Sequence, residues 1–190
     1  MEIGAQGLII ISSTLIIGYF IFITYNNNNL ESVKSNIDNR SYTVQSKEDA
    51  QGAADLIAVI RQKLILLVNH LIKSYPKDNR VEMLKENFNP DKLKEGVDNP
   101  DYTSYSINKG EQIVLCLRNK DKLMDINTMM FVVLHEMAHL ATESIGHTSE
   151  FWENFKWILE ESINIGIYIK QEFKKEPVEY CGMTITSSPL

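Results

Sequence analysis

Three of the four histidines in this 190-residue chain lie in one short stretch. In the motif His135-Glu136-Met137-Ala138-His139, the two histidines are four residues apart, so on an α-helix they share one face about 5–6 Å apart. Both imidazoles can therefore bind one metal ion. Glu136 is turned roughly 100° around the helix, which makes it a poor ligand but a suitable general base. The pattern predicts a hydrolytic zinc site.

A third ligand is expected soon after this motif. A straight helix would carry His147 roughly 12 Å beyond His139, too far for a zinc–nitrogen bond of about 2.1 Å. Gly146 precedes His147, and glycine commonly ends helices and turns the chain. We therefore predict His147 as the third ligand, which leaves an open position for water. The alternative is a glutamate of the next helix, Glu160 or Glu161, as in thermolysin-like enzymes.

Charge and cysteine content restrict the possible partners. The net charge is −6 and the sequence pI is about 5.3, so we expect no nucleic-acid partner. The two cysteines, Cys116 and Cys181, belong to no CxxC pair and cannot form a disulfide framework. We predict two reduced thiols, with a single bridge as the alternative. Cys181 could also bind and silence a zinc ion, although a packed thiol is the simpler interpretation.

The N-terminal segment has the composition of a membrane anchor. No Asp, Glu, Lys, Arg or His occurs from Gly4 to Asn29, and Gly7 to Tyr25 is long enough to cross the ~30 Å hydrocarbon core. A cleaved signal peptide fits less well, because Glu2 stands where a basic residue is expected. We predict a transmembrane anchor over residues 1–29 and a single-pass membrane protein. The positive-inside rule favours a cytoplasmic catalytic domain.

The rest of the chain divides into a linker and one domain. Residues 30–51 are rich in polar side chains and predict a solvated stalk. Residues 52–190 suffice for one domain. Within it, three- and four-residue apolar spacing predicts long helices, and alternating runs flanking an Asn-Lys-Gly turn predict a hairpin whose second strand could pair with a peptide. The expected elements are helices at 53–73, 80–86, from Asp125 or Asn127 to about 145, and 149–164, strands at 102–107 and 112–118, and an irregular tail from 177.

The metal motif and its surroundings resemble a known family. The motif at 135–139, the Gly146-His147 pair and the Phe151-Trp152 pair are similar to zincin metallopeptidases of the WLM and SprT-like group. The run 102–190, with its segments 103–111 and 180–183, looks like uncharacterised putative metallopeptidases of large DNA viruses. The resemblance implies an α+β, mainly helical zincin-like domain with a small antiparallel sheet or hairpin before the motif helix. It also implies zinc held by His135, His139 and His147, Glu136 as catalytic base, and a peptide or protein substrate.

Two questions stay open at this stage. A donor to the transition-state oxyanion is expected, and we predict Tyr180, with Tyr105 and Tyr168 as rivals. The second possible function is a catalytically inactive or structural zinc-binding protein that serves in interactions at a viral or host-cell membrane or in a virion. The presence of Glu136 favours the enzyme, because a structural zinc site needs no base.

Overall fold

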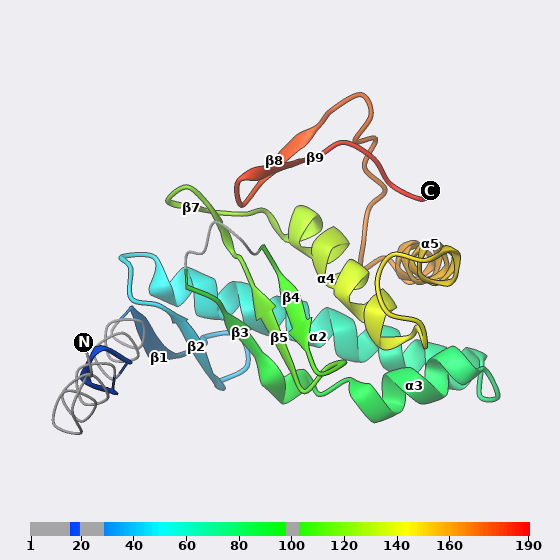
Figure 1. Ribbon diagram of the computed structural model, residues 1–190, viewed down its shortest axis with the longest axis horizontal. Coiled ribbons are helices and arrows are strands. Elements are labelled where there is room, and N and C mark those ends of the chain that lie inside the picture. Colours follow the sequence, from blue (N-terminus) through cyan, green and yellow to red (C-terminus); the bar gives the residue numbers. More distant parts are fainter. Residues whose placement is uncertain (1–15, 20–28, 98–102) are drawn as a thin grey trace, which may run out of the picture.

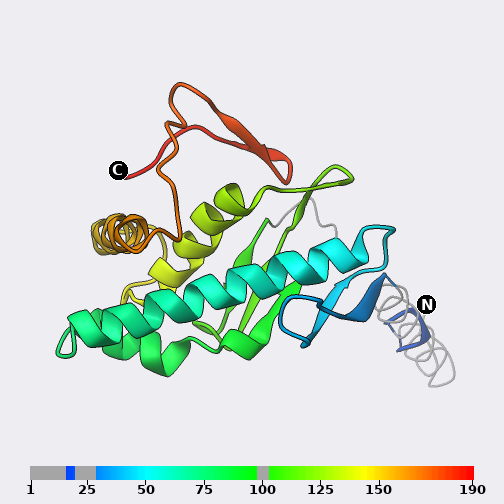
Figure 2. The ribbon, with the colours of Figure 1, turned by 180° about the vertical axis from the view of Figure 1, so that it is seen from behind.

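The computed structural model describes residues 16–19, 29–97 and 103–190, and it shows helices packed around a small sheet (Figure 1). The long helix α2 lies along one face of the sheet, and α4 connects the sheet to α5 and to the C-terminal hairpin (Figure 2). The elements are β1 (Leu30–Lys34), β2 (Ser41–Gln45), α2 (Ala50–Ser74), α3 (Asn79–Asn87), the 3-10 helix η1 (Pro90–Lys92), β3 (Leu93–Glu95), β4 (Tyr105–Ile107), β5 (Gln112–Leu115), β6 (Arg118–Asn119), β7 (Lys122–Leu123), α4 (Ile126–Leu140), α5 (Ser149–Asn164), β8 (Val178–Tyr180) and β9 (Met183–Ile185).

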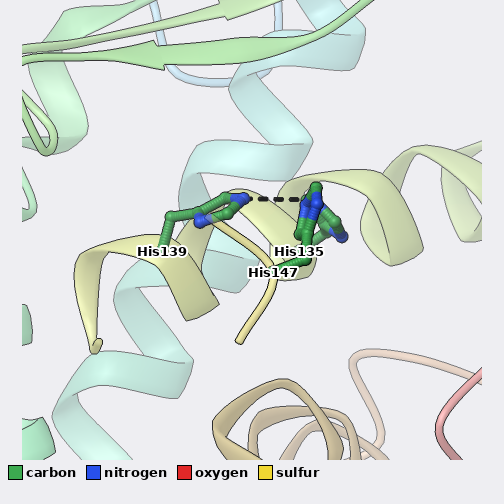
Figure 3. A group of neighbouring side chains, drawn as sticks. All are labelled: His135, His139 and His147. Carbon is green, nitrogen blue, oxygen red and sulfur yellow. Dashed lines mark hydrogen bonds between the residues drawn. The ribbon is translucent and has the colours of Figure 1, made fainter. Parts of the chain in front are cut away.

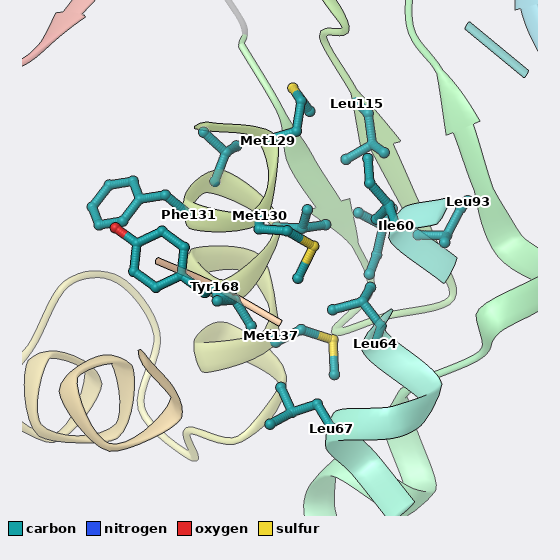
Figure 4. Close-up of a cluster of buried hydrophobic side chains, with 14 of the residues drawn as sticks. Ile60, Leu64, Leu67, Leu93, Leu115, Met129, Met130, Phe131, Met137 and Tyr168 are labelled. Atoms are coloured by element: carbon teal, nitrogen blue, oxygen red, sulfur yellow. The ribbon is translucent and has the colours of Figure 1, made fainter. Parts of the chain in front are cut away.

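The core forms where α2 meets α4. The expected apolar face of α2 is buried, and its Ile60, Leu64 and Leu67 face Met130 and Met137 of α4 (Figure 4). All five side chains are fully buried. At roughly 1.5–3 kcal/mol for each large apolar side chain, this contact is a principal source of stability and fixes the orientation of the motif helix.

The sheet has the strand order β3-β5-β4, with β4 antiparallel and β3 parallel to the central β5. The predicted hairpin is confirmed, and its turn residues Asn108, Lys109 and Gly110 all have positive φ. A Cβ at Gly110 would lie 2.3 Å from the Asn87 carbonyl oxygen, so only glycine fits. The expectation that the second strand pairs with substrate is wrong. β5 pairs with β3 on one side and with β4 on the other, so β3 and β4 are the edge strands of the described sheet.

Helix α4 begins as predicted and ends earlier than predicted. Asp125 is the N-cap, and its carboxylate accepts hydrogen bonds from the backbone N–H groups of Asn127 and Thr128. The helix ends at Leu140 rather than near residue 145. There the hydroxyl of Thr142 donates to the carbonyl of Ala138 at 2.6 Å, which satisfies a carbonyl of the last turn. The chain then leaves the helix axis before it reaches the third histidine.

The C-terminal tail is ordered into a hairpin, which corrects the expectation of an irregular tail. β8 and β9 pair antiparallel, and the turn between them contains Cys181 and Gly182 at positive φ. Cys181 forms a disulfide with Cys116, just after β5. The expectation of two reduced thiols is therefore wrong, as is a zinc-binding role for Cys181. The tertiary fold brings the two cysteines together across a sequence separation of 65 residues.

The segment 30–51, expected to be a solvated stalk, belongs to the folded body. β1 and β2 form an antiparallel hairpin, and Tyr42 and Val44 of β2 are buried in the same core as α2. Asp55 of α2 accepts hydrogen bonds from the Ser35 hydroxyl and the Asn36 backbone N–H. Alternation within β2 was too short to be recognised as a strand among the surrounding polar residues.

The predicted membrane anchor is also corrected. Within the ranges 16–19, 29–97 and 103–190, the structure has no helix with both the length and the apolar character needed to cross a bilayer. Most of the segment 7–25 on which that prediction rested lies outside the described residues. This finding contradicts the predicted transmembrane helix and the single-pass location.

A buried ion-pair network ties the early strands to α2. The guanidinium of Arg118, in β6, bonds the carboxylates of Glu95 in β3 and Asp49 at the start of α2. The Glu95 carboxylate also accepts a hydrogen bond of 2.7 Å from the backbone N–H of Gln45. Arg118 and Glu95 are both buried, and the attraction between their opposite charges offsets the cost of removing each charge from water.

Candidate metal centre and its cleft

The three predicted histidines converge at the end of α4 (Figure 3). The Nε2 atoms of His135 and His139 are 3.3 Å apart, and those of His135 and His147 are 3.0 Å apart. Four ligands at about 2.1 Å from a tetrahedral zinc ion are themselves separated by about 3.4 Å. The observed spacings are close to that value, so the three residues fit one zinc ion.

The loop between α4 and α5 places His147 beside the other two histidines. Gly146 has φ +86°, a left-handed conformation, directly before His147. The Glu150 carboxylate holds the residues that precede Gly146. It accepts hydrogen bonds from the backbone N–H groups of Glu143 and Ser144, and one from the Ser144 hydroxyl at 2.6 Å. These bonds restrict the loop and lower the pKa of Glu150.

Two more side chains fasten the ends of this loop. The buried amide of Asn154 donates to the Ala141 carbonyl at 3.1 Å and to the Thr142 hydroxyl at 3.0 Å. The Lys109 ammonium, in the β4–β5 turn, donates to the Glu143 carbonyl at 2.8 Å. The carbonyls after α4 are thus satisfied by α5 and by the hairpin, and the loop has a defined path.

An aromatic floor supports the imidazoles. Phe151, fully buried in the first turn of α5, stacks on His139 with ring centroids 4.3 Å apart. It contacts the rings of His135 and His147 at 4.8 and 4.7 Å. Trp152 lies 5.7 Å from His147. The Phe151-Trp152 pair that follows the metal motif therefore orients its ligands.

Burial keeps His135 and His139 neutral. Desolvation, with repulsion between the imidazoles, lowers the pKa of His135 to about 3 and that of His139 to about 4. Metal binding requires an unprotonated ring nitrogen. At neutral pH these two residues therefore present lone pairs without first releasing a proton.

Glu136 lies beside the histidines but points toward the sheet. It is 5% exposed, and burial raises its pKa to about 7, while contacts with the side chain and backbone of Ser106 oppose the rise. Ser106 belongs to the edge strand β4. A carboxylate with a pKa near 7 can both accept and return a proton at neutral pH, as a general base must.

These groups open into one cleft of about 750 Å³, a volume typical of ligand sites. Its walls are α4, the edge strand β4, the loop that carries His147 and the C-terminal hairpin. The lining residues are Thr103, Ser104, Tyr105, Ser106, Lys109, Phe131, Val132, His135, Glu136, His139, Ser144, Ile145, Gly146, His147, Tyr180, Met183, Thr184, Ile185, Thr186 and Ser187.

Tyr180 lines this cleft, but its hydroxyl is engaged in a closed ring of hydrogen bonds. The Cys116 backbone N–H donates to the Ser104 hydroxyl at 2.9 Å, and the Ser104 and Tyr180 hydroxyls are 2.5 Å apart. Tyr180 in turn donates to the Cys116 carbonyl at 3.0 Å. Burial raises the pKa of Tyr180. The contacts fix the end of β8 next to the hairpin turn, and a role for this hydroxyl as oxyanion donor stays a prediction.

The rival residues lie in different surroundings. Glu161 bonds His70 and Tyr75, each at 2.7 Å, between α2 and α5, and Glu160 faces Lys156 on the surface. Tyr168 packs on Phe131 in the core. Tyr105 lines the cleft from β4. Within the described residues the metal-type cluster contains the three histidines.

Sequence reasoning missed the residues that hold the loop and the hairpin. Ser104, Ser106, Lys109, Glu150 and Asn154 are common residue types with no diagnostic spacing, and all but Glu150 have partners twelve or more residues away in sequence. Only Glu150 carried a local signal, because an acidic residue in the first turn of a helix is typical of the position.

The three converging histidines resemble the metal centre of zincin-like metallopeptidases. The chain belongs to the WLM domain family, whose model matches residues 35–189. The expected resemblance is thus confirmed, and the match includes most of the segment first interpreted as a stalk.

The relatives come from large DNA viruses, as the resemblance suggested. Uncharacterized protein R325 of Acanthamoeba polyphaga mimivirus is 33% identical, over 96% of this chain and 98% of that protein. Uncharacterized protein 136R of Invertebrate iridescent virus 6 is 38% identical over 41% of this chain and 44% of its own length. Among solved structures, Wss1 from Saccharomyces cerevisiae aligns with a TM-score of 0.49 and 23% identity, covering 64% of this chain and 85% of that one.

Proposed function

We propose that this protein is a zinc-dependent peptidase that hydrolyses peptide bonds in extended polypeptides. The observation that carries the proposal is the convergence of His135, His139 and His147 beside the buried Glu136, at the floor of an open cleft. A structural zinc site is closed by four protein ligands, whereas a catalytic one has three and an open position. The cluster in the described residues has three.

The chain's own groups divide the chemistry between them. A bound zinc ion supplies Lewis acidity, which polarises the scissile carbonyl and lowers the pKa of water to about 7. The Glu136 carboxylate takes a proton from the attacking water and gives it to the nitrogen of the leaving amine. Ser106 of β4 contacts this carboxylate and holds it at the border of the cleft. Membership in the WLM family supports this assignment.

The edge strand β4 supports an extended substrate. β4 pairs with β5 along one side and borders the cleft along the other. An extended peptide can add to such an edge through main-chain hydrogen bonds, independently of its sequence. Since Ser106 of β4 also contacts Glu136, a peptide aligned on this strand would lie next to the general base.

The test uses the zinc-loaded chain and an unstructured protein as substrate. Glu136→Gln should retain zinc and lose roughly 10²–10⁴-fold of the cleavage rate, the usual contribution of a general base. Glu153→Gln makes the same change on the exposed face of α5 and should cleave like the native chain. Chelation should abolish native cleavage and zinc should restore it. An active Glu136→Gln protein, or cleavage insensitive to chelator, would contradict the proposal.

The same experiment separates the second possible function. An inactive or structural zinc-binding protein would hold zinc in both the native chain and Glu136→Gln, and would cleave nothing in either form. The buried, raised-pKa carboxylate beside the histidines favours the enzyme, because leaving such a group in a low-dielectric site costs stability.

A further inference from the structure

Apolar side chains from three separate elements line the cleft. Phe131 and Val132 lie on α4, one turn before His135 and Glu136. Ile145 lies in the loop that carries His147, and Met183 and Ile185 lie in β9 of the C-terminal hairpin. The hairpin supplies no member of the histidine cluster, so its apolar residues are not required to hold zinc.

Two of these side chains are exposed although they are large and apolar. Ile145 is 90% exposed and Met183 is 48% exposed, and both border the cleft. Single exposed apolar residues are ordinary, but a group of them around a concave site marks a surface that buries apolar area on binding. A substrate side chain of matching character would gain free energy by covering them.

The two side chains Lys109 and Glu136 of the cleft lining already have partners within the protein. Among the lining residues that the structure describes, the acidic and basic side chains besides the histidines are Lys109 and Glu136. Lys109 donates to the carbonyls of Thr142 and Glu143, and Glu136 is buried beside Ser106. A charged substrate side chain would lose water in the cleft without gaining an opposite charge, which is unfavourable.

The wall formed by the hairpin is held in place before substrate binds. Tyr180 is bonded to Ser104 and to the Cys116 carbonyl, and the next residue, Cys181, is linked covalently to Cys116. These bonds join the hairpin to the connection between β5 and β6. A preformed wall requires little ordering when a ligand binds, so more of the contact energy becomes affinity.

We propose that this apolar wall makes the enzyme selective for a bulky hydrophobic residue next to the scissile bond, and that Met183 of the C-terminal hairpin is a determinant of that selectivity. The proposal rests on the peptidase function above. It adds the substrate class, namely extended segments with exposed Leu-, Met- or Phe-like side chains. Such segments are characteristic of unfolded polypeptides, because folded proteins bury these residues.

The test is a set of internally quenched peptides that differ at one position, occupied by Leu, Phe, Ser, Asp or Lys, in an otherwise Gly-Ser-Ala background. The zinc-loaded native chain should cleave the Leu and Phe peptides with a kcat/KM at least tenfold above the Ser, Asp and Lys peptides, because burial of a large apolar side chain is worth about a factor of ten or more. Mass spectrometry should locate cleavage beside the variable residue. Equal rates for all five peptides would overturn the proposal while leaving the peptidase function intact.

The role of the hairpin is tested by Met183→Asp. This exposed position tolerates a charge, and the new carboxylate should raise the Lys-to-Leu ratio of kcat/KM at least tenfold. Leu66→Asp is the matched control, since Leu66 is 57% exposed on α2 and does not line the cleft. A Lys-to-Leu ratio that stays unchanged in Met183→Asp, or changes equally in Leu66→Asp, would overturn the assignment of Met183.

Binding to Glu136→Gln separates failure of this proposal from failure of the peptidase function. If no peptide is cleaved by the native chain, the peptidase function fails. The zinc-loaded Glu136→Gln protein should still bind a fluorescent Leu peptide at least tenfold more tightly than the Ser peptide. Equal binding of the two would overturn the apolar selectivity independently of turnover.

Discussion

Removal of the Cys116–Cys181 disulfide should destabilise the protein without affecting its zinc site. The bond joins residues 65 apart in sequence, and closing a loop of that length removes unfolded-state entropy worth about 4 kcal/mol. The double variant Cys116→Ala, Cys181→Ala should therefore lose about 4 kcal/mol of unfolding free energy. The Tyr180 hydrogen bonds remain available in the variant, so the native hairpin should persist.

Guanidinium denaturation at fixed zinc concentration measures this loss. A phosphine reductant should destabilise the native chain by the same amount and leave the double variant unchanged, which serves as the matched control. Zinc titration should give equal affinities for both proteins, because the proposed metal ligands are the three histidines. Two titratable thiols in the untreated native chain, or a loss below about 1 kcal/mol, would refute the reasoning.

Three further predictions concern residues that act through burial. Asn154→Ala should cost about 1–3 kcal/mol and weaken zinc binding, because the Ala141 carbonyl loses its buried donor; an unchanged zinc affinity would contradict the positioning role. Arg118→Ala should cost about 3–5 kcal/mol in denaturant melts by stranding the Glu95 charge, whereas Arg118→Met combined with Glu95→Leu should cost far less. In metal-free protein the pKa of Glu136 is raised from 4.5 to about 7, so the contribution of Glu136 to the unfolding free energy is full below pH 4.5 and is lost as the pH rises to about 7. The unfolding free energy of the native chain relative to Glu136→Gln should therefore fall across that pH range. A difference that stays constant with pH would refute the raised pKa.

The local chemistry of the site was readable from the sequence. The four-residue spacing of His135 and His139 depends only on helix periodicity, and the Asp125 cap and the Asn108-Lys109-Gly110 turn depend on backbone preferences of individual residues. The helix at 149–164 was predicted with its observed bounds, because its apolar period is long and its start is capped by Thr148.

Features that depend on distant partners were mispredicted. The polar composition of residues 30–51 indicated a solvated stalk. Burial of Tyr42 and Val44 in the same core as α2 instead makes this segment part of the folded domain. The early end of α4 follows from the Thr142 bond and from the α5 amide that meets the exposed carbonyls, neither of which has a sequence signature. The apolar run near the N-terminus indicated a membrane helix that the described structure does not contain.

The sequence by itself predicted the metal-binding pair His135 and His139 and the base Glu136, because all three follow from spacing along one helix. Only the tertiary structure decided what surrounds them: the edge strand beside Glu136, the loop that returns His147, and the disulfide that fixes the hairpin over the cleft. The physical reason is that helical periodicity is a property of neighbouring residues, whereas burial and covalent pairing depend on segments that meet only after the chain has folded.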